Sequence, residues 1–107
     1  MSPRNDLDDY QAAAARTINP ALDERERLLD AAAGLAEEAG EALSHVRKHV
    51  MQGRPLDRDA LAKELGDALW CIAVAARCIE IPLSEVAEHN LAKLQARHPD
   101  GFTGYHE

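Results

Sequence analysis

Apolar residues recur along most of this chain at intervals of three and four, the spacing of one face of an α-helix. The pattern predicts four helices, over residues 6–18, 23–51, 57–79 and 84–97. Asp23, Asp57 and Ser84 are suitable N-caps for the last three of them. No stretch alternates apolar and polar residues as a strand does. Because the loops are short, we expect an all-α fold, an antiparallel four-helix bundle.

The second and third predicted helices each carry a continuous apolar stripe. In the second helix it consists of Leu28, Ala32, Leu35, Ala39, Leu43, Val46 and Val50, and in the third of Leu61, Leu65, Ala68, Ile72, Ala76 and Ile79. Trp70 lies opposite the stripe of the third helix, which is therefore apolar nearly all round and should be buried on every side. A chain of 107 residues cannot easily bury such a helix. We therefore expect homo-oligomerisation, at least as a dimer, to complete the bundle. We expect Trp70 to pack in the core or the interface, with stacking on a base as the less favoured alternative.

Length and charge narrow the possible functions. The length predicts one domain, spanning residues 1–107. A net charge of −7 argues against nucleic acid as a partner, since phosphate backbones require a basic face. No apolar run approaches the roughly 20 residues of a membrane span, and no charged-then-apolar leader precedes the first helix. We expect a cytoplasmic protein without membrane contact, in which Cys71 and Cys78 are reduced thiols.

Acidic residues at the helical spacing i, i+3 are the candidate chemistry. Glu38 lies about 90° from the centre of its apolar stripe, and Glu41 lies about 60° further round. Glu64 and Asp67 occupy the matching shoulder of the third helix. If the two helices pack by their stripes, the four carboxylates converge at the edge of the core and need a counter-charge. Mg²⁺, or Mn²⁺ in its place, fits such a set of oxygen ligands.

Other interpretations of these acids are available. A single pair of acids at this spacing is usually a solvated surface feature, although two matching pairs on consecutive helices make that interpretation less favoured. A di-iron bundle would require Glu-x-x-His pairs, which this chain lacks. His45 and His49 lie near the same shoulder, where they border the site, pack with the alanines or hold a softer metal.

Three segments together resemble the MazG-like nucleoside triphosphate pyrophosphohydrolases: GLAEEAGEAL (34–43), KELGDALW (63–70) and NLAKLQARHPDGF (90–102). The signature of that family is an ExxE pair, a spacer and an ExxD pair, which Glu38, Glu41, Glu64 and Asp67 fit. YQAAAARTINP (10–20) is also similar to the start of the short family members, so the resemblance covers nearly the whole chain. It implies that the four acids hold Mg²⁺ and that a nucleoside triphosphate is hydrolysed to monophosphate and pyrophosphate, in nucleotide-pool house-cleaning.

The resemblance also implies roles for residues outside the acid pairs. Asn90 and Lys93 match substrate-binding positions on the fourth helix, and Arg97 continues the same face. Lys48 is a lower-ranked substrate-binding candidate. Glu37 and Glu38 are candidates for activating the attacking water, although helix geometry directs Glu37 away from Glu41.

Two further expectations follow from the same comparison. Cys71 stands where some relatives carry a tyrosine near the phosphates, which puts that contact in doubt here. Family members are dimers or tetramers with sites near subunit boundaries, in agreement with the expected self-association.

No motif indicates which base the protein recognises, and Tyr10 and Gln11 are weak candidates for contacting it. The alternative function is a non-catalytic helical module that oligomerises or binds a nucleotide.

Overall fold

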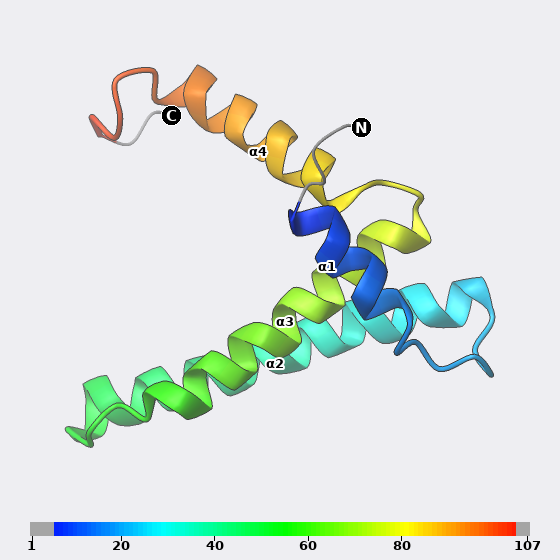
Figure 1. The fold of residues 1–107 in the computed structure, drawn as a ribbon. Helices are drawn as coiled ribbons and strands as arrows, with labels where there is room; N and C mark the ends of the chain where they lie inside the picture. Colours follow the sequence, from blue (N-terminus) through cyan, green and yellow to red (C-terminus); the bar gives the residue numbers. More distant parts are fainter. Residues whose placement is uncertain (1–5, 105–107) are drawn as a thin grey trace.

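The computed structural model describes residues 6–104, which form four helices and no strand. The helices are α1 (Asp6–Ala15), α2 (Glu24–Gln52), α3 (Arg58–Cys78) and α4 (Leu83–Arg97) (Figure 1). The all-α prediction is confirmed, and the bounds of α2 to α4 lie within one residue of those expected. α1 ends before the predicted Ile18, because the N–H groups of residues 16–18 each bond three residues back in tighter turns.

Local side-chain caps fix the starts of α2 and α3. Asp23 accepts a hydrogen bond from the Glu26 N–H at 2.8 Å, and the Glu26 carboxylate accepts one from the Asp23 N–H at 2.9 Å. Asp57 accepts from the Ala60 N–H at 3.0 Å. Gly53 ends α2 with φ 66°, a left-handed conformation that glycine adopts without strain. The predicted caps of these two helices are therefore confirmed.

The start of α4 corrects the prediction that Ser84 is its N-cap. The helix begins at Leu83, and the cap position is Pro82, whose side chain makes no capping bond. The first amides bond to α1 instead: Leu83 N–H donates to Gln11 Oε1, and Ser84 N–H to Asp8 Oδ1, both at 2.9 Å. The Ser84 hydroxyl donates to Asp8 Oδ2 at 2.7 Å. Residues of α1 thus supply the acceptors that the first turn of a helix needs.

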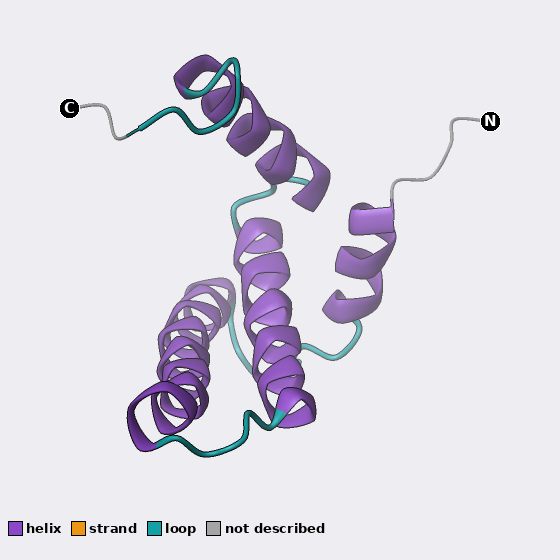
Figure 2. Ribbon diagram, turned by 90° about the vertical axis from the view of Figure 1, so that its left-hand side faces the viewer, coloured by secondary structure: helices purple, strands orange, loops and turns teal. Residues whose placement is uncertain are grey.

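α2 and α3 form an antiparallel hairpin, and α1 lies against the other side of α3 (Figure 2). Among the described helices, α4 contacts α1 and α3 but not α2, and α1 does not contact α2. Figure 1 shows α4 directed away from the hairpin. A single chain therefore does not close into the expected four-helix bundle.

The hairpin packs through small side chains. Ala31 of α2 is fully buried, and a Cβ on Gly34 would lie 2.9 Å from Sγ of the buried Cys71. Most of the apolar stripe of α2 is exposed instead, with Leu43 at 54% and Val50 at 67%. On α3, Leu65 is 58% exposed. The expected packing of stripe against stripe is therefore not found within one chain.

Trp70 connects α3 to the segment between α1 and α2. Its Nε1 donates a hydrogen bond to Thr17 Oγ1 at 2.8 Å, and its side chain is half-buried. This contact gives Trp70 a packing role.

Cys71 and Cys78 are both free thiols, the first buried and the second half-buried. None of the described helices has the length and apolarity that crossing a membrane requires.

Candidate metal centre

Three of the four predicted acids meet between α2 and α3. One carboxylate oxygen from each of Glu38, Glu64 and Asp67 lies within 4.8 Å of the others. Glu38 projects from α2, and the other two project from successive turns of one face of α3. Glu38 and Glu64 are half-buried, whereas Asp67 is exposed. These three residues are called the acid centre below, and Asp67 marks its solvent side.

The acid centre carries negative charge that no lysine or arginine among the described residues balances. Oε2 of Glu38 is buried and has no hydrogen-bond partner. The pKa of Glu38 is raised from 4.5 to about 7, first by a hydrogen bond with Glu64, then by desolvation, and then by the charges of Glu64, Asp67 and Glu41. Within residues 6–104, no lysine or arginine pairs with the three acids. Glu38 therefore holds a proton in part at neutral pH, in place of a counter-ion.

A divalent cation fits this arrangement. The three side chains offer hard oxygen donors, which Mg²⁺ and Mn²⁺ bind. The buried Oε2 of Glu38 makes no hydrogen bond with any described residue, so this oxygen is free to coordinate a cation. A cation would also replace the proton that the crowded charges attract to Glu38. Both the donor chemistry and the electrostatics thus favour metal binding here.

Glu41 and Glu37 lie on the outer side of α2. Both are exposed, and with Gly40 and Ser44 they line a pocket of about 370 Å³. Glu41 is not one of the three clustered acids, although its charge contributes to the raised pKa of Glu38. Its role as a metal ligand stays a prediction.

Cys71 is buried on the face of α3 that packs against α2. Burial raises the pKa of its thiol, and the charge of Glu38 raises it further. The side chain faces Gly34 rather than solvent. Cys71 therefore remains a neutral thiol that helps to pack the hairpin.

The predicted substrate-binding residues lie apart from the acid centre within one chain. Asn90, Lys93 and Arg97 are exposed on α4, which does not contact α2. Lys48 is exposed on α2, about 15 Å along the helix axis from Glu38. One chain thus presents the acids and the expected cations on separate surfaces.

The two candidate histidines of α2 are separated by the structure. His45 borders the acid centre, with Nε2 4.0 Å from Glu64 Oε1. His49 is exposed, and its Nδ1 lies 2.7 Å from the carbonyl oxygen of Arg54 in the following loop. Only His45 is therefore placed to influence a bound ion.

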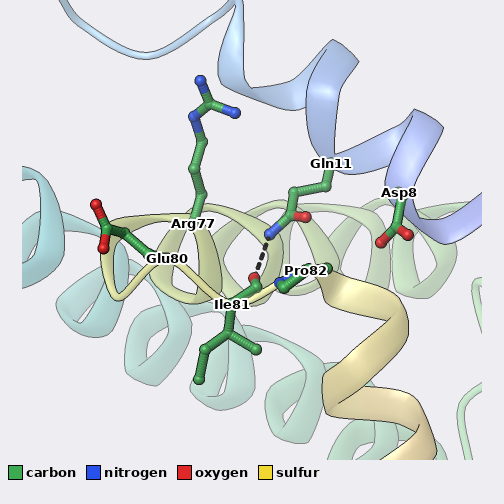
Figure 3. Close-up of a pocket in the computed structure, with 6 residues that line it drawn as sticks. All are labelled: Asp8, Gln11, Arg77, Glu80, Ile81 and Pro82. Atoms are coloured by element: carbon green, nitrogen blue, oxygen red, sulfur yellow. Dashed lines mark hydrogen bonds between the residues drawn. The ribbon is translucent and has the colours of Figure 1, made fainter.

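A pocket of about 540 Å³ lies at the junction of α1, α3 and α4, away from the acid centre. Figure 3 shows Gln11 reaching from α1 toward the chain at Ile81. Gln11 Nε2 donates to the carbonyl oxygens of Ala73 and Ile81, both at 3.1 Å, while Oε1 accepts from Leu83. Because the backbone of α3 and α4 engages its whole amide, Gln11 holds helices together rather than contacting a base. In the sequence, Gln11 lies four residues after Leu7 and three residues before Ala14, both apolar. This helical spacing was the signal that could have predicted a buried Gln11.

Comparison with known proteins agrees with this geometry. The family model of the MazG nucleotide pyrophosphohydrolase domain matches residues 27–102, which include the acid centre and α4. The Gene 37 protein of Mycobacterium phage L5 is 38% identical over 103 residues, covering 89% of this chain and 90% of that protein. No solved structure gives a significant match. The chain belongs to the MazG nucleotide pyrophosphohydrolase family.

Proposed function

We propose that this protein hydrolyses a nucleoside or deoxynucleoside triphosphate to the monophosphate and pyrophosphate, with Mg²⁺ as the cofactor and Mn²⁺ as an alternative. The observation that carries the proposal is the meeting of the Glu38, Glu64 and Asp67 carboxylates, one of which, Glu38, has a buried oxygen without a hydrogen-bond partner. In a member of the MazG family, such a centre is best explained as the site that receives the triphosphate. House-cleaning of the nucleotide pool is the proposed role.

The residues of α2 and α3 would divide the chemistry between them. Glu38, Glu64 and Asp67 hold the cation, and Glu41 completes the set from the next turn of α2. The bound cation supplies charge neutralisation for the phosphoryl oxygens and lowers the pKa of a water molecule. Glu37 and Glu38 are the proposed proton acceptors for the attacking water. Glu37 is exposed on the outer side of α2, and the pKa of metal-free Glu38 is already near 7.

A second copy of the chain would complete this site. The triphosphate needs cationic and amide donors, which Asn90, Lys93 and Arg97 offer on α4. In one chain these residues stand apart from the acid centre, while apolar side chains of α2, α3 and α4 are exposed. Packing these apolar faces against a second copy would bury them and bring an α4 from one chain to the acid centre of another. We therefore propose a homodimer or homotetramer in which the chains share each site.

The experiment is pyrophosphate release from a panel of nucleoside and deoxynucleoside triphosphates, with Mg²⁺, Mn²⁺ or EDTA. We expect release that requires the cation and is lost in Glu38→Gln and Asp67→Asn. Glu88→Gln is the matched control, because Glu88 is an exposed acid of α4 outside the acid centre. Activity in EDTA, or full activity in Glu38→Gln, would contradict the proposal.

The second candidate function is a non-catalytic helical module. The exposed apolar side chains of α2 and α3 favour it, since they would support oligomerisation without catalysis. It predicts no cation-dependent release from any triphosphate and no thermal shift with Mg²⁺ and nucleotide together. The assay panel therefore separates the two functions.

A further inference from the structure

A pocket of about 490 Å³ lies where the start of α2, the end of α3 and the segment after α1 meet. Two arginines line it, Arg27 from α2 and Arg77 from the last turn of α3. Ile18, Cys78 and Ile79 give it an apolar side. A pocket of this size, with a few convergent polar groups beside an apolar wall, is typical of a small-molecule site.

Arg27 presents a hydrogen-bond donor that the described chain leaves unused. Its Nε is buried and has no hydrogen-bond partner. A buried charged donor without a partner is costly, so this nitrogen needs an acceptor that the described chain does not supply. Arg27 lies one turn before the fully buried Ala31, on the face of α2 toward α3. Packing at the end of the hairpin therefore holds this donor at the pocket.

Two glutamates of the same pocket do not neutralise the arginines. Glu24 precedes Arg27 by three residues, and Glu80 follows Arg77 by three. Within residues 6–104, neither arginine has a carboxylate at ion-pair distance. Figure 3 shows Arg77 and Glu80 extending in different directions from the end of α3. Both guanidinium groups are therefore available to an anion.

The pocket is separate from the acid centre. Arg27 and Glu38 lie eleven residues apart on α2, about 16 Å along the helix axis. Eleven residues are close to three turns, so both side chains lie on one face of the helix. The buried Ala31 and the contact of Gly34 with Cys71 close the seam between them. A ligand in this pocket is therefore not held by the proposed metal ligands.

The two walls of the pocket define the chemistry of a ligand. The planar fork of a guanidinium group matches the oxygens of a phosphate, and two such groups match the double charge of a phosphate monoester. Free phosphate would leave the apolar side of the pocket unused. An ester can place its organic group against Ile18 and Ile79 instead. The pocket therefore favours an ester over free phosphate.

We propose that this pocket binds a small phosphate monoester: Arg27 and Arg77 hold the phosphate, and the organic group packs against Ile18 and Ile79. The inference goes beyond the proposed function and does not rest on it, because the acid centre takes no part. It assigns a binding site and no covalent step.

Phenyl phosphate is the probe, because it joins a phosphate to an apolar group. Its binding to the metal-free full chain is measured by isothermal titration calorimetry, with inorganic phosphate and phenol as comparisons. We expect phenyl phosphate to bind more tightly than inorganic phosphate, and phenol to show no measurable binding. Equal or tighter binding of inorganic phosphate would assign the pocket to the free ion and overturn the ester. Binding of neither anion would overturn the whole inference.

Substitutions test the two arginines. Arg27→Gln and Arg77→Gln should each weaken phenyl phosphate binding by about 10-fold or more, because each removes a hydrogen bond between charged groups. Arg25→Gln is the matched control, since Arg25 is an exposed arginine of α2 that lines a different pocket. Glu80→Gln should tighten binding, because it removes a negative charge from the pocket wall. Equal loss in Arg25→Gln, or full affinity in Arg27→Gln, would overturn the inference.

A resonance of Arg27 tests the contact without relying on the folding of a variant. The ¹H–¹⁵N signal of Arg27 Nε should shift during titration of the unmodified protein with phenyl phosphate. The same signal should stay unchanged with phenol. An unmoved Arg27 Nε signal at saturating phenyl phosphate refutes the inference.

Glu38→Gln separates this inference from the proposed function. It alters the acid centre and should leave the affinity of the metal-free chain for phenyl phosphate unchanged. Loss of binding in Glu38→Gln would place the anion at the acid centre and overturn the inference. Failure of pyrophosphate release from every triphosphate would contradict the proposed function alone, since phenyl phosphate binding is measured without cation or substrate.

Discussion

Gly34 of α2 and the thiol of Cys71 in α3 face each other at a contact that only a glycine permits. A Cβ at residue 34 would lie 2.9 Å from Sγ, which is shorter than side-chain carbons tolerate. Glu38 emerges one turn further along α2, on the side that meets Glu64. The close approach of the helices at Gly34 therefore helps to set the distances within the acid centre.

Gly34→Ala should destabilise the protein, because either the Cys71 side chain or the helices must move. Forcing a methyl group into a packed contact costs about 1–3 kcal/mol, measured as the free energy of unfolding in urea. Gly40→Ala is the matched control, since a Cβ there meets no atom within 4 Å. Its higher helix propensity should stabilise the protein by up to about 1 kcal/mol.

Cys71→Ala should rescue Gly34→Ala by removing the atom that the new methyl group meets. The double variant should be more stable than the sum of the two single changes predicts, which is the sign of direct contact. Strict additivity of the two changes would show that the residues do not touch.

The raised pKa of Glu38 predicts how the metal-free protein responds to pH. The folded pKa of about 7 exceeds the ordinary glutamate pKa of 4.5, so the folded state binds the extra proton between these values. The contribution of Glu38 to stability is therefore fully present below pH 4.5 and is lost as pH rises through about 7. In EDTA, the melting temperature should fall over this range more steeply for the unmodified protein than for Glu38→Gln.

Metal ions should reverse this loss at pH 8, because a cation replaces the proton as the counter-charge of the centre. The stabilisation by Mg²⁺ or Mn²⁺ should be absent in Glu38→Gln. Identical pH profiles for Glu38→Gln and the unmodified protein in EDTA would contradict the raised pKa.

Helices could be predicted from signals within a few residues, whereas hydrogen bonds between residues far apart in the sequence could not. The box of Asp23 with Glu26 is complete within four residues, and it fixed the start of α2 correctly. The start of α4 depends on Asp8 and Gln11, which lie 76 and 72 residues from the groups they cap. No local window contains that information.

The packing face of the hairpin was missed for a different reason. Large apolar residues dominate a search for a stripe, so Leu43 and Val50 indicated the wrong face of α2. Ala31 and Gly34, which lie on the face toward α3, contribute little hydrophobicity although they allow close approach. Three of the four acids were nevertheless recognisable as a cluster, because the i, i+3 spacing places Glu64 and Asp67 together whichever face is buried.

Gln11→Leu should loosen α4 from the rest of the chain. Removing the amide takes away the partner that Gln11 gives the Ile81 carbonyl oxygen and the Leu83 N–H, and it removes the additional bond to the Ala73 carbonyl oxygen within α3. Each buried group left unpaired costs about 1–3 kcal/mol, so we expect a large loss in unfolding free energy and faster amide exchange at the start of α4. Gln95→Leu, at an exposed position of α4, is the control. Unchanged exchange in Gln11→Leu would contradict the clamp.

The separation of the acid centre from α4 predicts self-association and complementation between inactive chains. Light scattering during size exclusion should give a mass at least twice 11.7 kDa, and a monomer at micromolar concentration would contradict a shared site. Glu64→Gln and Lys93→Ala should each be inactive alone. If one chain supplies the acids and its partner supplies α4, a mixture of refolded variants contains some sites with neither change.

In a randomly mixed symmetric dimer, about a quarter of the sites would be intact, and pyrophosphate release should recover to that level. The control is a mixture of Glu64→Gln with Asp67→Asn. Both changes lie in the same acid centre, so every site built from one chain's acids retains one of them, and no activity should return. Recovery in the first mixture alone requires that Lys93 reach the acids of another chain. Absence of recovery, with mixed dimers present, would place Lys93 and the acids of one site on the same chain.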